Sequence, residues 1–307
     1  MVNRRDFVKS AAGAGALFGL AGRAPAAQTG MFVALSTALT GNKLAWPDFV
    51  RLAARVGFGG TDLLLGPAMQ EGADATRGLL TELKLRTSFA TLPVNVTGTE
   101  EVFRKGMTTL EDSAKFVSGV GCGRMMMVLP ASSQTPADEL RRLLRDRLTA
   151  AGVVLARWNV RLGLEFLGPL NIRTRAPHEF IWRMSDAVEF AKECGPNIGV
   201  VLDSWHWHHS GSTVDDIIRA GKSRIVTIHI SDAAKQAPED VRDNQRLLPG
   251  EGVIDLIGFL RALKQVGYED GLSPEALGRI PADTPPEEGA RMGLEATLAV
   301  MRKAGVA

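Results

Sequence analysis

Four residues that can bind a metal ion stand at the ends of short apolar runs in the second half of the chain. They are Glu165, Asp203, His229 and Glu275, with separations of 38, 26 and 46 residues, so no local metal-binding loop unites them. A carboxylate that ends an apolar run is costly to bury unless it is paired or coordinated. Because three carboxylates and one imidazole form a donor set suited to a divalent cation, we expect the four side chains to share one ion.

Residues this far apart in the sequence can share one site only if strands and helices bring them together in the fold. The spacing of apolar residues predicts such strands and helices. Short apolar runs predict strands at Met31–Ser36, Thr61–Leu65, Thr87–Leu92, Met125–Leu129, Leu162–Phe166, Gly199–Asp203, Ile225–Ile230 and Asp270–Pro274. Longer segments with a helical period predict helices at Trp46–Val56, Thr99–Val120, Ala137–Trp158, Glu179–Cys194, Val214–Ala220, Ile254–Val266 and Pro286–Met301. Strands and helices therefore alternate along the chain.

This alternation, in a chain of 307 residues that is 45% apolar, is typical of an α/β fold built as one (β/α)8 TIM barrel. We expect the barrel to span residues 28–307. The C-terminal ends of barrel strands lie on one face, so all four candidate ligands would meet there. An open, doubly wound sheet is the alternative fold. It usually has a Gly-rich phosphate turn after its first strand, and residues 35–41 lack that pattern.

Residues 1–27 are predicted to be a twin-arginine (Tat) signal peptide, with an amphipathic N-terminal helix as the alternative. The pair Arg4–Arg5 precedes a weakly apolar stretch rich in Gly and Ala and a small-residue cleavage site near Ala26 or Ala27. The stretch is too short for a stable membrane anchor, which needs about 20 apolar residues. We therefore expect export by the Tat translocase, signal cleavage and a periplasmic protein.

Charge and cysteine content narrow the function classes. The chain has 36 basic and 34 acidic residues, a net charge of +2, which does not indicate a nucleic-acid surface. Its two cysteines, Cys122 and Cys194, follow or end predicted helices. Two buried thiols are favoured over a disulfide, although an oxidising periplasm would permit one. The sequence does not determine the oligomeric state, and a homo-oligomer is compatible with it.

The motifs around the four candidate ligands resemble those of the xylose-isomerase-like TIM barrels, the sugar phosphate isomerase/epimerase superfamily. The similarity rests on Glu at the fifth strand, Asp-x-x-His at the sixth, His-x-Ser-Asp at the seventh, a later Arg-x-x-Pro-Gly-x-Gly and Glu at the eighth. It runs from about Met31 to the C-terminus, and the ketose 3-epimerase branch is the most similar. One departure is the interval of 17 residues between His229 and Arg246, which is longer than in the epimerases.

The resemblance implies roles for individual residues. The implied ligands of one divalent cation are Glu165, Asp203, His229 and Glu275. The implied ion is Mn²⁺, with Mg²⁺, Co²⁺ or Zn²⁺ as alternatives, and Glu165 and Glu275 would also act as acid and base. His206 and Arg246 match the family's substrate-binding residues. Trp205, beside His206, either stacks on a sugar ring or caps the barrel.

These residues together predict a metal-dependent sugar isomerase or epimerase that works through an enediolate. A divalent cation that binds a hydroxyl and the adjacent carbonyl acidifies the neighbouring C–H bond and stabilises the enediolate. One carboxylate on each face can then remove and return a proton. Export favours an unphosphorylated sugar or keto-sugar as the substrate, because sugar phosphates are mainly cytosolic.

Two other readings stay open, and a third is excluded. A lyase or dehydratase acting on a 3-keto-glycoside or a related keto compound would share the enediolate. An exported, non-catalytic sugar-binding barrel with a structural metal is the second alternative. A nuclease of the endonuclease-IV type needs several histidines from early strands, and no histidine precedes His178.

Overall fold

Eight parallel strands close into a barrel in the computed structural model, which describes residues 30–307. The strands are Phe32–Leu35 (β1), Gly60–Leu63 (β2), Arg86–Thr91 (β3), Arg124–Val128 (β4), Arg161–Glu165 (β6), Ile198–Asp203 (β8), Ile225–Ile230 (β9) and Gly271–Pro274 (β10). They follow one another around the barrel in chain order, and β10 closes it by pairing with β1. The predicted (β/α)8 TIM barrel is thereby confirmed.

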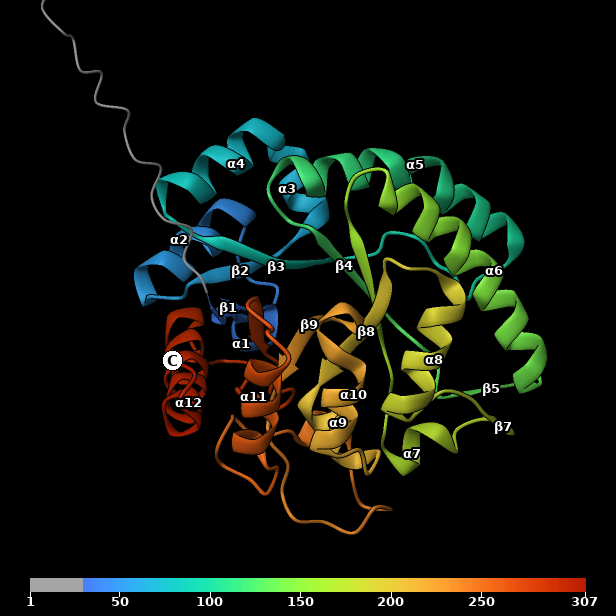
Figure 1. Cartoon of the computed structure of the whole chain (residues 1–307). Coiled ribbons are helices and arrows are strands. Elements are labelled where there is room, and N and C mark those ends of the chain that lie inside the picture. The colour runs from blue at the N-terminus through green and yellow to red at the C-terminus, as the bar shows by residue number, and fades with distance from the viewer. Residues whose placement is uncertain (1–29) are drawn as a thin grey trace, which may run out of the picture.

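Helices form the layer outside the strands. The longer ones are Trp46–Val56 (α2), Leu65–Glu71 (α3), Ala73–Glu82 (α4), Glu100–Gly119 (α5), Ala137–Ala156 (α6), Met184–Cys194 (α8), Val214–Arg224 (α10), Leu256–Gln265 (α11) and Pro286–Ala304 (α12). Three short helices follow strand ends, at Thr37–Thr40 (α1), Leu170–Arg173 (α7) and Ser204–His209 (α9). Figure 1 shows the red α12 beside the blue α1 and α2, so the two ends of the barrel sequence meet.

Helix α2 shows how local sequence produces this layer. Its apolar residues recur on one face, and Trp46, Phe49 and Leu52 are each at most 2% exposed because that face packs on the strands. Pro47 stands in the first turn, where its missing N–H costs no helical hydrogen bond. Gly57 ends the helix at φ +101°, a left-handed conformation that favours glycine.

The structure corrects the predicted elements at two places. The helix predicted from Glu179 begins only at Met184, because His178–Glu179 (β7) pairs antiparallel with Ser132–Ser133 (β5) outside the barrel. No helix was predicted between the second and third strands, yet α3 and α4 occupy residues 65–82. Only Ala68, Thr76 and Leu80 are buried in these two short helices, so the apolar residues do not form a regular helical stripe there.

Pro274 is the last residue of β10, a position where the sheet tolerates a residue with no N–H to donate. The next residue restores the pairing, since the N–H of Glu275 donates to the carbonyl oxygen of Ile230 at 3.0 Å. The C-terminal end of β10 is thus hydrogen-bonded to β9 on both sides of the proline. This fixes the backbone from which the Glu275 side chain extends.

Two further expectations concern thiols and termini. Cys122 and Cys194 are both free and buried, and burial raises the pKa of each thiol, that of Cys194 to about 12.

Within residues 30–307, no helix combines the length and apolar character needed to cross a bilayer. The predicted Tat signal of residues 1–27 lies outside the described part of the chain.

Candidate metal centre

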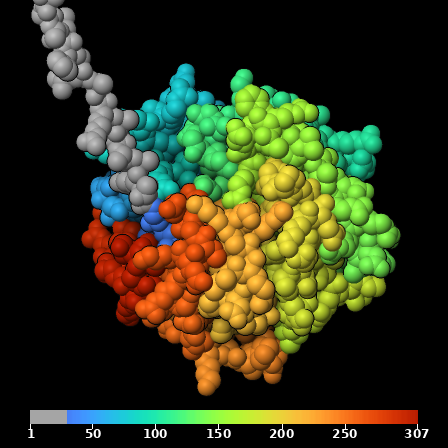
Figure 2. All heavy atoms as spheres, viewed as in Figure 1, coloured from blue at the N-terminus to red at the C-terminus, as the bar shows by residue number. Residues whose placement is uncertain are grey.

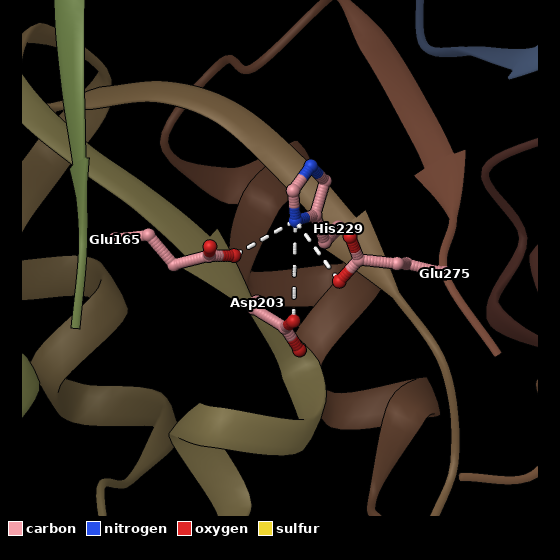
Figure 3. A group of neighbouring side chains, drawn as sticks. All are labelled: Glu165, Asp203, His229 and Glu275. Carbon is pink, nitrogen blue, oxygen red and sulfur yellow. Dashed lines mark hydrogen bonds and ion pairs between the residues drawn. The ribbon is translucent and has the colours of Figure 1, made fainter. Parts of the chain in front are cut away.

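The four candidate ligands converge at the C-terminal face of the barrel. Glu165 ends β6, Asp203 ends β8, His229 is the fifth residue of β9, and Glu275 follows β10 directly. These four strands are consecutive neighbours in the barrel, and Asp203 lies opposite His229 in the β8–β9 pairing. Figure 3 shows the three carboxylates around the imidazole, with Glu165 and Glu275 on opposite sides of it.

The distances within this group are short. Nδ1 of His229 lies 2.8 Å from Glu165 Oε1, 3.4 Å from Glu275 Oε2 and 4.0 Å from Asp203 Oδ2. One ligand atom from each residue lies within 4.8 Å of all the others. Glu165, Asp203 and His229 are buried, whereas the Glu275 side chain is 23% exposed. The group therefore forms a nearly closed cage with one carboxylate at its open side.

The two carboxylate oxygens of Asp203 have different roles: one caps helix α9 and the other faces the candidate metal centre. Its Oδ1 caps α9 by accepting from the N–H of Trp205 at 2.7 Å and of His206 at 3.4 Å. Its Oδ2 faces His229 and Arg246. Because the capping bonds fix the carboxylate plane, the second oxygen points into the centre without free rotation.

Arg246 enters the centre from the loop after β9 and is buried, at 2% exposure. Its Nη1 donates to Asp203 Oδ2 at 2.7 Å and to Glu275 Oε2 at 2.8 Å. Its Nη2 lies 3.2 Å from Nε2 of His206. The structure thus brings Arg246 to the predicted site, and the long interval from His229 is accommodated by the loop between them.

The remaining predicted residues lie beside this arginine. The Trp205 ring is 2% exposed and has the Arg246 guanidinium 4.8 Å from its centroid. Among the described residues, Nδ1 of buried His206 has no hydrogen-bond partner. Such a nitrogen is costly to leave unpaired, so it is available to a bound ligand. The contact that the structure shows for Trp205 is with Arg246, so stacking on a sugar ring and capping of the barrel both stay predictions.

Asp232 anchors the loop that carries Arg246. Its Oδ1 accepts from the N–H groups of Ala233 and Ile254 at 2.9 and 3.0 Å, and its Oδ2 accepts from Gly250 and Gly252, each at 3.0 Å. The Asp of the His-x-Ser-Asp motif and the glycines of the Pro-Gly-x-Gly motif are therefore parts of one hydrogen-bonded unit. These hydrogen bonds hold the loop after β9 at the C-terminal face of the barrel, where Arg246 reaches the four candidate ligands.

Charges inside the centre strongly perturb its ionisable groups. Burial alone would lower the pKa of His229, but Glu275 and Glu165 raise it well above the ordinary value of 6.5. Burial would raise the pKa of Glu275, but His229 and Arg246 hold it well below its usual range. Burial likewise opposes the charge of Arg246, whose pKa Asp203 and Glu275 nevertheless raise. The centre is thus dominated by carboxylate charge.

The donor set fits a divalent cation. Carboxylate and imidazole ligands bind such ions at about 2.0–2.2 Å, so two ligands of one ion are at most ~4.4 Å apart. The four ligand atoms already lie within 4.8 Å of one another. Asp243 also pairs with the guanidinium of Arg246, so four carboxylates and one guanidinium leave three excess negative charges when His229 is neutral, and a divalent cation would offset two of them. Only small movements would complete the coordination.

Sequence reasoning did not select Asp62, at the third position of β2. Its carboxylate is buried and accepts from the hydroxyl of Ser273 at 2.6 Å. Burial raises its pKa to about 7, a shift to which His229 and Glu275 also contribute in opposite senses. The signal that could have found Asp62 is the one used for the ligands, a carboxylate inside an apolar run.

A groove of about 650 Å³ lies beside the C-terminal end of α9. It is walled by residues 169–173, by the end of α9 and by the loop after β9, and its polar lining includes His208, His209 and Lys235. Burial lowers the pKa of His209 to about 4, so this imidazole is neutral. The loop after β9, in orange, protrudes at the lower edge of Figure 2.

Comparison with known proteins agrees with the barrel fold. Residues 50–302 match the family described as "Xylose isomerase-like TIM barrel". The chain belongs to this family. The family therefore covers β2 to α12 and contains all four candidate ligands together with His206 and Arg246.

Individual relatives are similar over different lengths. An inosose isomerase of Bacillus subtilis is 31% identical over 139 residues, 45% of this chain and 48% of that protein. The chain thus spans about half the length of the curated relatives it matches. A xylose isomerase domain protein of Alicyclobacillus acidocaldarius has a TM-score of 0.82 and 28% identity, covering 90% of this chain and 99% of that one. The IOLI protein, solved with a zinc atom, has a TM-score of 0.75 and 21% identity, with 90% and 99% covered.

Proposed function

We propose that this protein is a divalent-metal-dependent isomerase or epimerase of an unphosphorylated sugar or keto-sugar. The observation that carries the proposal is the convergence of three carboxylates and one imidazole on four consecutive strand ends. Family membership and the inosose isomerase relatives support sugar isomerisation, and the zinc atom in the IOLI protein supports a divalent cation. Mn²⁺ is the ion we propose, with Mg²⁺, Co²⁺ or Zn²⁺ as alternatives.

Two of the ligands are suited to proton transfer. A cation held by Glu165, Asp203, His229 and Glu275 would polarise a substrate carbonyl and stabilise the enediolate. Glu165 and Glu275 come from the two outer strands of the set and face each other across His229 (Figure 3). Carboxylates on opposite sides of a planar intermediate can remove a proton from one face and deliver it to the other. Asp203 and His229 serve chiefly as anchors.

Neighbouring side chains would orient the sugar. His206 offers its unpartnered Nδ1, and Arg246 brings a buried guanidinium to the edge of the cage. We assign to Trp205 the role of holding Arg246 in place, because the guanidinium carbon of Arg246 lies 4.8 Å from the centroid of the Trp205 ring and Trp205 is almost fully buried. Together His206 and Arg246 would supply donors to the hydroxyl and carbonyl oxygens of a substrate.

The proposed substrate class depends partly on export. The Arg4–Arg5 pair and the small-residue site near Ala26 or Ala27 support a Tat signal and a periplasmic location. Fractionation of cells that produce the full chain should recover a shortened protein from the periplasm. Replacing both arginines with lysine should retain the full-length precursor in the cytoplasm. An unshortened cytoplasmic protein in both strains would contradict export.

A second candidate is a lyase that acts on a 3-keto-glycoside or a related keto compound, because it would form the same enediolate with the same carboxylates and cation. In that reaction the enediolate expels its β-substituent instead of regaining a proton. Product analysis separates the candidates directly, since a lyase releases the second unit and an epimerase returns an intact glycoside.

Solvent exchange tests the proposed reaction class. Mn²⁺-loaded protein is incubated with candidate keto-sugars in D₂O, and deuterium is followed by NMR at the carbon beside the carbonyl. We expect exchange with the wild type and its loss in Glu165→Gln and Glu275→Gln. The matched control is Glu193→Gln, an exposed carboxylate on α8 that pairs with Arg141, where exchange should persist.

Each outcome of this test has a clear meaning. Exchange that disappears in both active-site variants while they still bind Mn²⁺ supports the two-carboxylate mechanism. Sugar binding without exchange in the wild type would instead indicate a non-catalytic sugar-binding barrel. Exchange that survives in both Glu→Gln variants would refute the assignment of the acid and base.

A further inference from the structure

A layer of polar side chains lies inside the barrel beside the metal centre. Thr227 and Ser273 stand two residues before His229 and Glu275 on β9 and β10, so each shares the inward face with a ligand. Ser88 of β3 lies 3.2 Å from Thr227 and 3.3 Å from Ser273, measured between hydroxyl oxygens. Barrel interiors are normally filled by branched apolar side chains, so this layer is an exception that calls for a reason.

Asp62 supplies the ionisable group of this layer. The Ser273 hydroxyl donates to its Oδ1 at 2.6 Å. No salt bridge to Asp62 is formed by residues 30–307, so its burial is not compensated by a cationic partner in contact. Burial raises its pKa to about 7, and at neutral pH the carboxyl is therefore half protonated.

The charges that Asp62 faces belong to the metal centre. His229 of β9 favours its ionised form, and Glu275 after β10 favours its protonated form. The buried thiol of Cys122, before β4, is also in its surroundings and is neutral because burial raises its pKa. The proton on Asp62 is therefore sensitive to any change of charge at the adjoining ligands.

We propose that Asp62 is a proton-holding residue linked to the metal centre, which loses its proton when a divalent cation binds there. The ionised carboxylate then accepts more strongly from Ser273 and holds the end of β10 in place. Since Glu275 is two residues further on, Asp62 acts as a positioning residue for that carboxylate. This inference rests on the proposed cation site and not on the sugar reaction.

Proton release on metal binding tests the linkage. Metal-free full-length protein is titrated with Mn²⁺ in a weakly buffered solution containing a pH indicator, and the protons released per bound ion are counted. At pH 7 the wild type should release about half a proton more than Asp62→Asn, because a group with a pKa of about 7 is half protonated there. At pH 9 the two proteins should release equal amounts.

Two variants separate the proton from the hydrogen bond. Ser273→Ala removes the bond that lowers the pKa of Asp62, so at pH 7 it should release more protons than the wild type. It should also lower kcat roughly tenfold with little change in KM, because Glu275 loses its positioning. The control is Thr297→Ala, a buried hydroxyl on α12 that bonds only Gly293 and should alter neither quantity.

Equal proton release by wild type and Asp62→Asn at pH 7 would overturn the proposal. So would unchanged release in Ser273→Ala, which keeps the test decisive if Asp62→Asn does not fold. A wild type that binds no Mn²⁺ would refute the cation site and this inference together. Normal proton linkage without sugar turnover would leave the inference standing and refute the proposed reaction.

Discussion

Replacement of Asp232 by asparagine should loosen the loop that delivers Arg246, although Asp232 contacts none of the four candidate ligands. Its carboxylate accepts four backbone N–H groups at 2.9–3.0 Å and is 1% exposed. Asparagine has the same shape but only one acceptor oxygen. In either orientation its NH₂ group faces two N–H donors, so two hydrogen bonds are lost and replaced by repulsion.

The magnitude follows from those two donors. An unsatisfied buried donor costs about 1–3 kcal/mol. Gly250 and Gly252 lie at the exposed edge of the loop, so the lower part of the range applies, and the free energy of unfolding should fall by ~2–3 kcal/mol. For a chain of this size each kcal/mol shifts Tm by roughly 2 °C, so Asp232→Asn should melt about 4–6 °C lower.

Thermal unfolding followed by circular dichroism measures this change, and Asp255→Asn is its control. Asp255 is also an aspartate of this loop, but it accepts a single N–H, from Gly258 at 2.9 Å, as the cap of α11. Asparagine caps helices as well as aspartate does, so the control should shift Tm by less than about 2 °C. A Tm decrease in Asp232→Asn no larger than in the control would refute the reasoning. An unchanged KM for the exchanging sugar would also contradict the link to Arg246.

Two further predictions concern pH and backbone space. In the metal-free protein the pKa of His229 is raised above 6.5, so protonation of His229 stabilises the folded state. This stabilisation is complete below about pH 6.5 and is lost as the pH rises through the raised pKa. Chemical denaturation should show the free energy of unfolding falling above pH 6.5, and His229→Gln should flatten this decline; parallel curves would contradict the assignment. A Cβ added at Gly252 would lie 2.2 Å from the carbonyl oxygen of Ala233, so Gly252→Ala should lower Tm by several degrees. The control is Gly78→Ala, because a Cβ added at Gly78 of α4 would meet no atom within 4 Å, and this change should leave Tm unchanged or raise it. Equal Tm changes in the two variants would show that the clash predicted at Gly252 is relieved.

The apolar periodicity of the sequence was sufficient to predict the barrel and the position of its candidate ligands. Strand and helix periods depend on local spacing, and a barrel places successive strands side by side in chain order. Once Glu165, Asp203, His229 and Glu275 are assigned to strand ends, their convergence follows from the fold class. Weakly periodic segments were less predictable, and residues 65–82 form helices that the pattern did not indicate.

The contacts around the ligands were decided by the tertiary structure. Arg246 bonds Asp203 and Glu275 because a loop held by Asp232 returns it to the barrel face, and no local spacing encodes that path. The bond between Asp62 and Ser273 joins residues 211 positions apart on strands that are not neighbours. Such contacts depend on strand register and barrel closure, which local pattern leaves undetermined. The sequence by itself therefore determines the set of candidate ligands, and the folded barrel determines which charges surround them.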